Sequence, residues 1–195
     1  MLIHVNLNTF IAFVHRALRD FDDVKAGDLG GFIEKESNLS HDGNCWVYDD
    51  AIVAYDAIVS KNAKVRNEAA VAGNAKVYGN AIVSGKAKVY GHDTHVYGNA
   101  QVSDNASVNG SMWVRGKGVV HSKCVVNDNA KVYGDAKVSG SAYIYEGAHI
   151  FDNARVYGKA VVYKDVKIYG NAALKEKKTF RDDVCSNDAI SEKTA

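Results

Sequence analysis

Asn74-Ala75-Lys76-Val77-Tyr78-Gly79 and Asn129-Ala130-Lys131-Val132-Tyr133-Gly134 are two nearly identical copies of a six-residue repeat that runs through most of the chain. We number each repeat from its aliphatic residue, called position i, which is Val77 in the first copy and Val132 in the second. Aliphatic residues recur in this way from Val47 to Leu174, giving 22 repeats. Position i−2 is Ala in 16 of these repeats, and position i+2 is often Gly.

This repeat predicts an all-β solenoid. Each copy is a short extended piece followed by a Gly-Asn-Ala turn, because Gly and Asn tolerate the positive φ that a tight turn needs. Three extended residues are too few for an ordinary β-sandwich strand, whereas a six-residue period suits one side of a triangular coil. Three repeats then make one coil, so that 22 repeats predict about seven coils. Position i should stack on the residue 18 positions further along.

The remaining segments flank the predicted solenoid, which spans residues 47–174. Residues 1–46 are expected to cap its first coil, since an open sheet edge recruits other chains. In this cap, residues 2–5 and 10–18 alternate as short strands do, and Ile33 and Leu39 are candidate early rungs that are out of phase with the repeat. The polar tail, residues 175–195, is expected to be a short helix or disordered.

Composition excludes several classes of protein. The 195 residues carry a formal charge of only +1, so a nucleic-acid partner is not favoured. A secretory signal and a stretch of roughly 20 apolar residues that could span a membrane are not evident. The three cysteines are few and odd in number, which favours a reducing cytoplasm over a disulfide framework. Cys45 and Cys124 occupy the inward position i−2, four coils apart, and should not form a bridge.

The N-terminal segment carries a more specific resemblance than the repeat does. The stretch from Ala17 to Glu34 (ALRDFDDVKAGDLGGFIE), followed by Asn38 to Ser40 (NLS) and Gly43 to Tyr48 (GNCWVY), resembles YdcK-like proteins of bacteria and their phages, which are labelled as acyltransferases. The hexapeptide itself resembles the left-handed parallel β-helix of hexapeptide-repeat acyltransferases. The resemblance implies a left-handed coil, a homotrimer, and transfer of an acyl group from acetyl-CoA or another acyl-CoA, with a histidine as general base. It identifies no catalytic residue of this chain.

Sorting the repeats by coil predicts one outward face that is rich in basic and aromatic side chains, because residues on either side of position i point outward. Two interpretations stay open. The residues could be strand-forming side chains that stabilise neighbouring coils. Alternatively, they could form a contact surface, either a subunit interface or a platform for an anionic or sugar-like partner. The candidate residues of this face are Tyr78, Tyr97, Trp113, Arg115, Lys131, Tyr133, His149, Phe151 and Tyr169.

Candidate chemistry lies at the one break in the repeat. His92 is the extra residue in Gly91-His92-Asp93-Thr94-His95, and loops often carry function. His92 or His95 could act as a general base, with Asp93 orienting the ring. The alternative is a tolerated insertion with solvated histidines. No metal site is predicted, since a spacing of three does not by itself bring the two rings to one ion. The pair Asp22-Asp23 is interpreted as solvated surface.

Two functions therefore remain open from the sequence. The chain could be an acyltransferase that uses acetyl-CoA or another acyl-CoA and an unknown acceptor, with help from a neighbouring subunit. It could instead be a non-catalytic β-helical scaffold or binding module, carried by a phage and acting on a host protein. The near-perfect repeat favours the second, because it leaves little irregular structure for a pocket.

Overall fold

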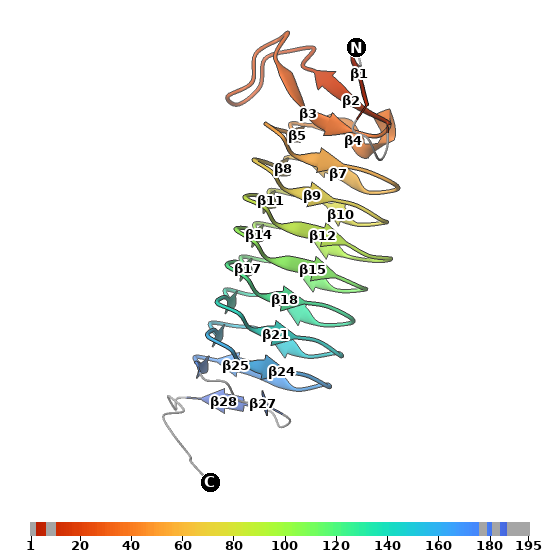
Figure 1. Cartoon of the computed structure of the whole chain (residues 1–195). Helices are drawn as coiled ribbons and strands as arrows, with labels where there is room; N and C mark the ends of the chain where they lie inside the picture. The colour runs from red at the N-terminus through yellow and green to blue at the C-terminus, as the bar shows by residue number, and fades with distance from the viewer. Residues whose placement is uncertain (1–2, 7–10, 176–178, 181–183, 187–195) are drawn as a thin grey trace.

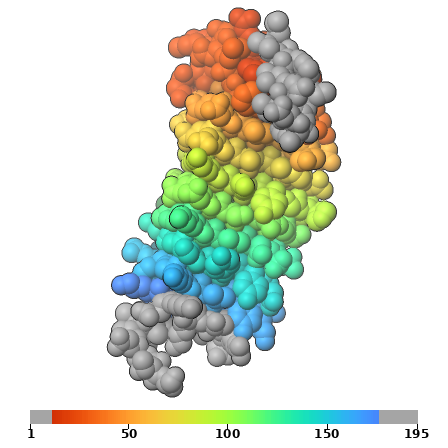
Figure 2. All heavy atoms as spheres, viewed as in Figure 1, coloured from red at the N-terminus to blue at the C-terminus, as the bar shows by residue number. Residues whose placement is uncertain are grey.

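The chain winds into a column of stacked β-coils, seen in a computed structural model that describes residues 3–6, 11–175, 179–180 and 184–186 (Figure 1). The predicted fold class is confirmed, since the chain is an all-β parallel solenoid of about eight turns. The space-filling view shows the coils following one another along a single axis in sequence order (Figure 2). Each coil therefore contacts mainly its neighbours, as expected for a repeat architecture.

Three sheets form the sides of the column. The first, which we call the capped sheet, contains antiparallel strands at its N-terminal end and parallel strands elsewhere. Its strands are β1 (Ile3–Asn6), β2 (Ile11–Arg16), β3 (Leu29–Ile33), β6 (Ile52–Val53), β9 (Ala70–Val71), β12 (Lys88–Tyr90), β15 (Ser107–Asn109), β18 (Val125–Val126), β21 (Tyr143–Ile144), β24 (Val161–Val162) and β27 (Thr179–Phe180).

The other two sheets are parallel throughout. The ladder sheet comprises β4 (Leu39–Gly43), β7 (Ile58–Lys61), β10 (Lys76–Val77), β13 (His95–Val96), β16 (Trp113–Val114), β19 (Lys131–Val132), β22 (His149–Ile150), β25 (Lys167–Gly170) and β28 (Val184–Ser186). The groove sheet comprises β5 (Trp46–Val47), β8 (Lys64–Val65), β11 (Ile82–Val83), β14 (Gln101–Val102), β17 (Val119–Val120), β20 (Lys137–Val138), β23 (Arg155–Val156) and β26 (Ala173–Leu174). One turn of 3₁₀-helix, η1 (Glu36–Asn38), precedes β4.

The core consists of the two inward positions of each repeat. Every aliphatic residue at position i, from Val47 to Leu174, is at most 1% exposed. The small residue at i−2 lies beside it, which leaves room for the chain to turn inward at each corner. The corner itself is made at position i+2, where every residue from Asp49 to Gly170 has a positive φ. This requirement explains why Gly, Asn and Asp are frequent there, since they adopt this conformation at the lowest cost.

The coil begins earlier and ends later than residues 47–174. Phe32 and Ile33 of β3 pair with Ile52 and Val53, and Leu39 of β4 pairs with Val59. These separations are 20 residues instead of 18, so Ile33 and Leu39 are early rungs out of phase, as predicted. At the other end, β27 and β28 continue the capped and ladder sheets. The expectation of a short helix or disorder is therefore wrong for residues 179–180 and 184–186, which are strands; the rest of the tail beyond residue 175 lies outside the described residues.

The cap is held against the groove sheet by polar contacts. The Lys64 ammonium lies 2.9 Å from the Asp22 carboxylate, and the Tyr48 hydroxyl donates to Asp23 over 2.7 Å. Arg66 lies over the Tyr48 ring, with its Cζ 4.4 Å from the ring centroid. Asp22 and Asp23 are exposed, as predicted, and they also have partners on the neighbouring coils that the sequence did not indicate.

The inserted residue shifts the register once. Lys76 pairs with His95 at a separation of 19, whereas His95 pairs with Trp113 at the usual 18. Thr94 fills the inward position of this repeat and is fully buried. Its hydroxyl contacts the carbonyl oxygens of Tyr90 at 2.8 Å and Gly110 at 2.7 Å, which closes the enlarged corner.

Candidate functional site on the ladder sheet

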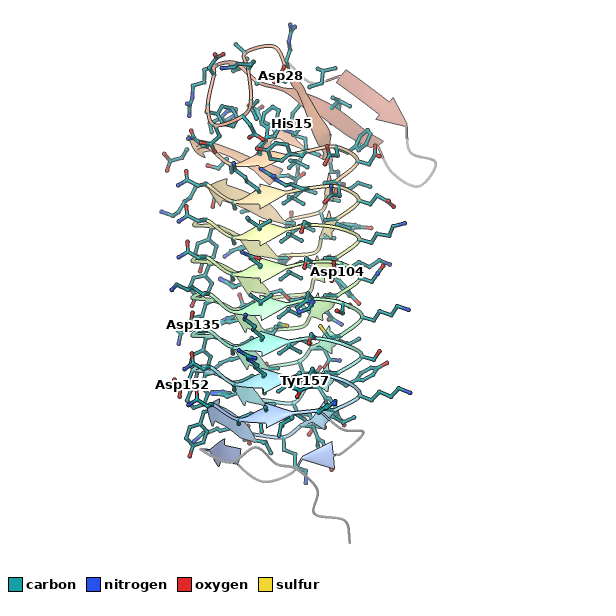
Figure 3. All side chains as sticks on the ribbon, turned by 90° about the vertical axis from the view of Figure 1, so that its left-hand side faces the viewer. His15, Asp28, Asp104, Asp135, Asp152 and Tyr157 are labelled. Carbon is teal, nitrogen blue, oxygen red and sulfur yellow. The ribbon has the colours of Figure 1, made fainter. Side chains whose placement is uncertain are left out.

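The predicted basic and aromatic face is the outer surface of the ladder sheet. The residues at i−1 stand in one column, because their strands pair in register: Lys76, His95, Trp113, Lys131, His149 and Lys167. The residues at i+1 form a second column beside it. Such columns of outward side chains run along the whole coil axis, as Figure 3 shows for the chain as a whole.

The i+1 column is a series of stacked rings. Tyr78 and Tyr97 stack at a centroid distance of 4.9 Å, and Phe151 stacks on Tyr133 at 4.9 Å and on Tyr169 at 5.1 Å. All three pairs are within 6° of parallel. Because both faces of the Phe151 ring are covered, this column presents mainly ring edges to a partner. The rings of neighbouring coils therefore contact one another face to face, which leaves little room for a sugar ring to stack.

Cations are part of both columns. The Arg115 guanidinium lies 4.9 Å from the Tyr133 centroid, and the Lys131 ammonium lies 5.2 Å from the Trp113 centroid. Both arrangements are cation–π contacts. Burial lowers the pKa of His149, and the nearby Lys131 and Lys167 lower it further. His149 is therefore a neutral side chain at neutral pH, set among fixed positive charges.

His95 is the residue of this face with the most developed hydrogen bonding. Its Nε2 lies 2.9 Å from Asp93 Oδ1, and its Nδ1 lies 3.3 Å from the Tyr78 hydroxyl. The His95 side chain is only 20% exposed, and its ring packs against Tyr78, Tyr97 and Trp113. A carboxylate at one ring nitrogen selects the tautomer and leaves the other nitrogen as a base.

His92, the other predicted base, is placed differently. It lies on the outside of the enlarged corner, is exposed, and makes no hydrogen bond within the described part of the chain. Asp93, which could have oriented either ring, orients that of His95. The structure therefore separates the two candidates and assembles partners around His95 alone.

His121 lies on the groove sheet, and its two side-chain partners were not evident from the sequence. Asp104 Oδ2 and Ser122 Oγ lie 3.5 Å and 3.1 Å from Nδ1 of His121. Both contact the same nitrogen, so they cannot relay a proton through the ring. Asp104 also accepts the Ser122 backbone N–H over 2.9 Å, a link between corners one coil apart. Asp49, Asn67 and Asp152 make the same kind of link to the next coil, which shows that it is structural.

A shallow groove of about 740 Å³ runs along the groove sheet over five coils. One wall follows the corner after the ladder sheet, where asparagines one coil apart bond to one another, as in Asn153 to Asn171 over 3.3 Å. The other wall carries Lys137 and Arg155. The sequence does carry a pattern that could have indicated this groove. Most ladder-sheet repeats have Asn at i+3, but this is visible only when the repeats are sorted by coil.

Thiol and metal chemistry find little support in the described residues. Burial raises the pKa of the Cys45 thiol to about 11 and that of Cys124 to about 12, so neither is a ready nucleophile. Both thiols are free and donate to backbone oxygens. Across residues 11–175, no three side chains of the metal-ligating types converge on one point.

Comparison with known proteins identifies the repeat. The YdcK β-solenoid repeat matches residues 75–91, 100–116 and 148–164. The chain carries YdcK-type solenoid repeats. It is also 47% identical over 47 residues to the uncharacterized acetyltransferase YdcK of Escherichia coli strain K12. That match spans 24% of this chain and 14% of the relative, so the chain shares only a small part of the relative's length. The first of the matched segments ends at Gly91, directly before the inserted residue.

None of the helical structure in the described residues could cross a membrane, since it is too short and too polar.

Proposed function

We propose that the chain is an acyl-CoA-dependent acyltransferase in which His95 is the general base. The observation that carries the proposal is the 2.9 Å contact between Asp93 and His95, which the single inserted residue creates on an otherwise regular face. The name of the YdcK relative, an uncharacterized acetyltransferase, points to the same chemistry.

In this proposal each nitrogen of the His95 ring has its own role. Asp93 accepts the Nε2 proton and leaves the lone pair on Nδ1, next to the Tyr78 hydroxyl. An acceptor amine or hydroxyl bound in place of that hydroxyl would give its proton to Nδ1 as it attacks the thioester carbonyl. The C–S bond then breaks, and the imidazolium returns the proton to the leaving CoA thiolate.

The groove offers a place for the acyl donor. Its first coil contains Asn99 and Gln101, which lie three and five residues after the end of β13, the strand of His95. Lys137 and Arg155 supply positive charge further along it, as phosphate groups of CoA would require, whereas Lys117 is paired with Asp135 at 3.9 Å. Because the ladder sheet is open to solvent around His95, we propose that a second subunit of a homotrimer covers it and excludes water.

Variants of the two histidines test the proposal. With acetyl-CoA as donor and a panel of primary amines and amino sugars as acceptors, His95→Ala should lower kcat/KM by roughly 10²–10⁴-fold, the range for loss of a general base. Asp93→Asn should lower kcat with little change in the KM for acetyl-CoA, since it alters the tautomer of the ring. His92→Ala is the matched control, because it removes an imidazole from the same corner. Activity that survives in His95→Ala would contradict the proposal.

A second candidate is a non-catalytic binding module that acts on a protein partner, such as a host protein if the chain is phage-borne. The closed stack of rings on the ladder sheet favours it, because ring edges and cations form a rigid, preorganised surface. Two results together would favour this candidate over acyl transfer. The charge reversal Lys131→Glu should abolish binding of the partner, and no variant should show turnover.

A further inference from the structure

A second cleft lies at the opposite end of the molecule from the C-terminal coils, between the cap and the first coil. Its volume is about 620 Å³, within the range typical of small-molecule sites. The floor is formed by Ile33, Leu39 and Cys45, the residues that begin the solenoid core on its three sides. The cap thus covers the first coil without filling the space above it.

The walls of this cleft are apolar and aromatic. Trp46 is in edge contact with His15 at 4.1 Å and with Phe21 at 5.5 Å between ring centroids. Leu18 stands at the rim and is 77% exposed. An apolar ligand in the cleft would cover this exposed leucine. We therefore expect the body of the ligand to be apolar.

The charge of the residues that line the cleft favours an anionic group on the ligand. Arg16 and Arg19 both line the cleft, whereas its one carboxylate, Glu36, is bonded to His41 over 2.9 Å. Arg16 donates from Nε to Gly27 O, and Arg19 donates from one terminal nitrogen to Gly43 O and Asn44. A guanidinium has five N–H donors, so each arginine keeps donors for an anion. The planar fork matches a carboxylate best.

The wall is also rigid and uncharged at its centre. His15 is 5% exposed and bonds through Nδ1 to the Gly31 carbonyl over 3.1 Å. Gly30 packs directly on the imidazole, at a distance that leaves no room for a Cβ. Figure 3 shows His15 inside the cap, above the first coils of the column. Burial keeps this ring neutral, so the positive charge of the cleft comes from its arginines.

From this geometry we infer that the cap cleft binds a small monocarboxylate with an apolar body, which lies against Phe21, Trp46 and Leu39 and directs its carboxylate to Arg16 and Arg19. The site is separate from His95 and requires no catalysis. It would let a small metabolite tie the cap to the first coil, because both contribute to the binding surface.

Trp46 provides a direct test, since the chain has two tryptophans and Trp113 lies on the ladder sheet. In the Trp113→Phe protein, phenylacetate should change the Trp46 fluorescence saturably in the millimolar range. Phenylacetamide, the neutral analogue, should bind at least about tenfold more weakly, because a hydrogen bond to a charged group is worth about 1.5–3 kcal/mol.

Charge variants complete the test. Arg19→Met and Arg16→Met should each weaken phenylacetate and leave phenylacetamide unchanged, whereas Arg155→Met, far along the groove sheet, should alter neither. The Trp46 indole signal in a ¹⁵N correlation spectrum shows whether each variant keeps the cap folded. A flat titration with phenylacetate would overturn the inference, and so would equal binding of the acid and the amide.

Discussion

Thr94→Val tests how the coil tolerates its one inserted residue. Thr94 is fully buried, and its hydroxyl contacts two carbonyl oxygens, those of Tyr90 and Gly110. Valine has nearly the same shape but no donor. The change removes a net hydrogen bond and leaves buried carbonyl groups less well satisfied, which together should cost about 2 kcal/mol of unfolding free energy. Thr94→Ser keeps the hydroxyl and loses one methyl group, at a cost of about 1 kcal/mol.

Thermal unfolding followed by circular dichroism distinguishes the two variants. For a chain of this size, 1 kcal/mol corresponds to roughly 2–4 °C in Tm, so we expect a fall of roughly 4–8 °C for Thr94→Val and half of that for Thr94→Ser. A valine variant that is as stable as the serine variant would refute the reasoning. The hydroxyl would then contribute nothing, and the enlarged corner would be held by packing alone.

Three further predictions concern pH, corner geometry and assembly. Burial lowers the pKa of His15 from 6.5 to about 4, so the stability that the neutral imidazole contributes is present above pH 6.5 and is lost as the pH falls towards 4. The difference between the urea unfolding free energies of the wild type and His15→Gln should therefore shrink by ~3 kcal/mol over that window. Lys61 has a φ of 61°, and Lys61→Gly should raise the unfolding free energy by about 1 kcal/mol, whereas Lys159→Gly, which is next to a corner glycine, should not. In light scattering, Tyr133→Asp should lower the mass of the proposed trimer, and an unchanged mass would mean that the ladder sheet is not the subunit contact.

The fold was predictable because each repeat obeys the same local rule. An inward aliphatic residue, an inward small residue and a corner with positive φ recur from Val47 onward, and the 18-residue register then follows from three repeats per coil. The same register predicts that His95 and Trp113 are neighbours on one face, and their strands do pair at these two residues.

The cap was less predictable because it lacks the repeat. Trp46 occupies an outward position, yet it is 5% exposed because the cap loop covers it. The partners of Asp22 and Asp23 are Tyr48, Lys64 and Arg66, which lie in or directly after β5 and β8, across a contact with no sequence periodicity. The cleft formed there depends on how closely the cap approaches the first coil, and that distance is not encoded in any local pattern.

The candidate base shows the same limit on a smaller scale. The break in the repeat is visible in the sequence, where His92, as the inserted residue, is the first candidate and His95 is the second. Only the path of the enlarged corner decides which ring meets Asp93, and that path depends on the contacts of the buried Thr94 hydroxyl. A residue spacing of three could not distinguish the two rings.

Calorimetric titration with acetyl-CoA tests the central claim most directly. We predict saturable binding that is weakened by Lys137→Glu in the groove and unaffected by Lys88→Glu on the capped sheet, a matched charge reversal outside the groove. Absence of binding at millimolar acetyl-CoA, or equal binding by both variants, would contradict acyl transfer from a donor held in this groove.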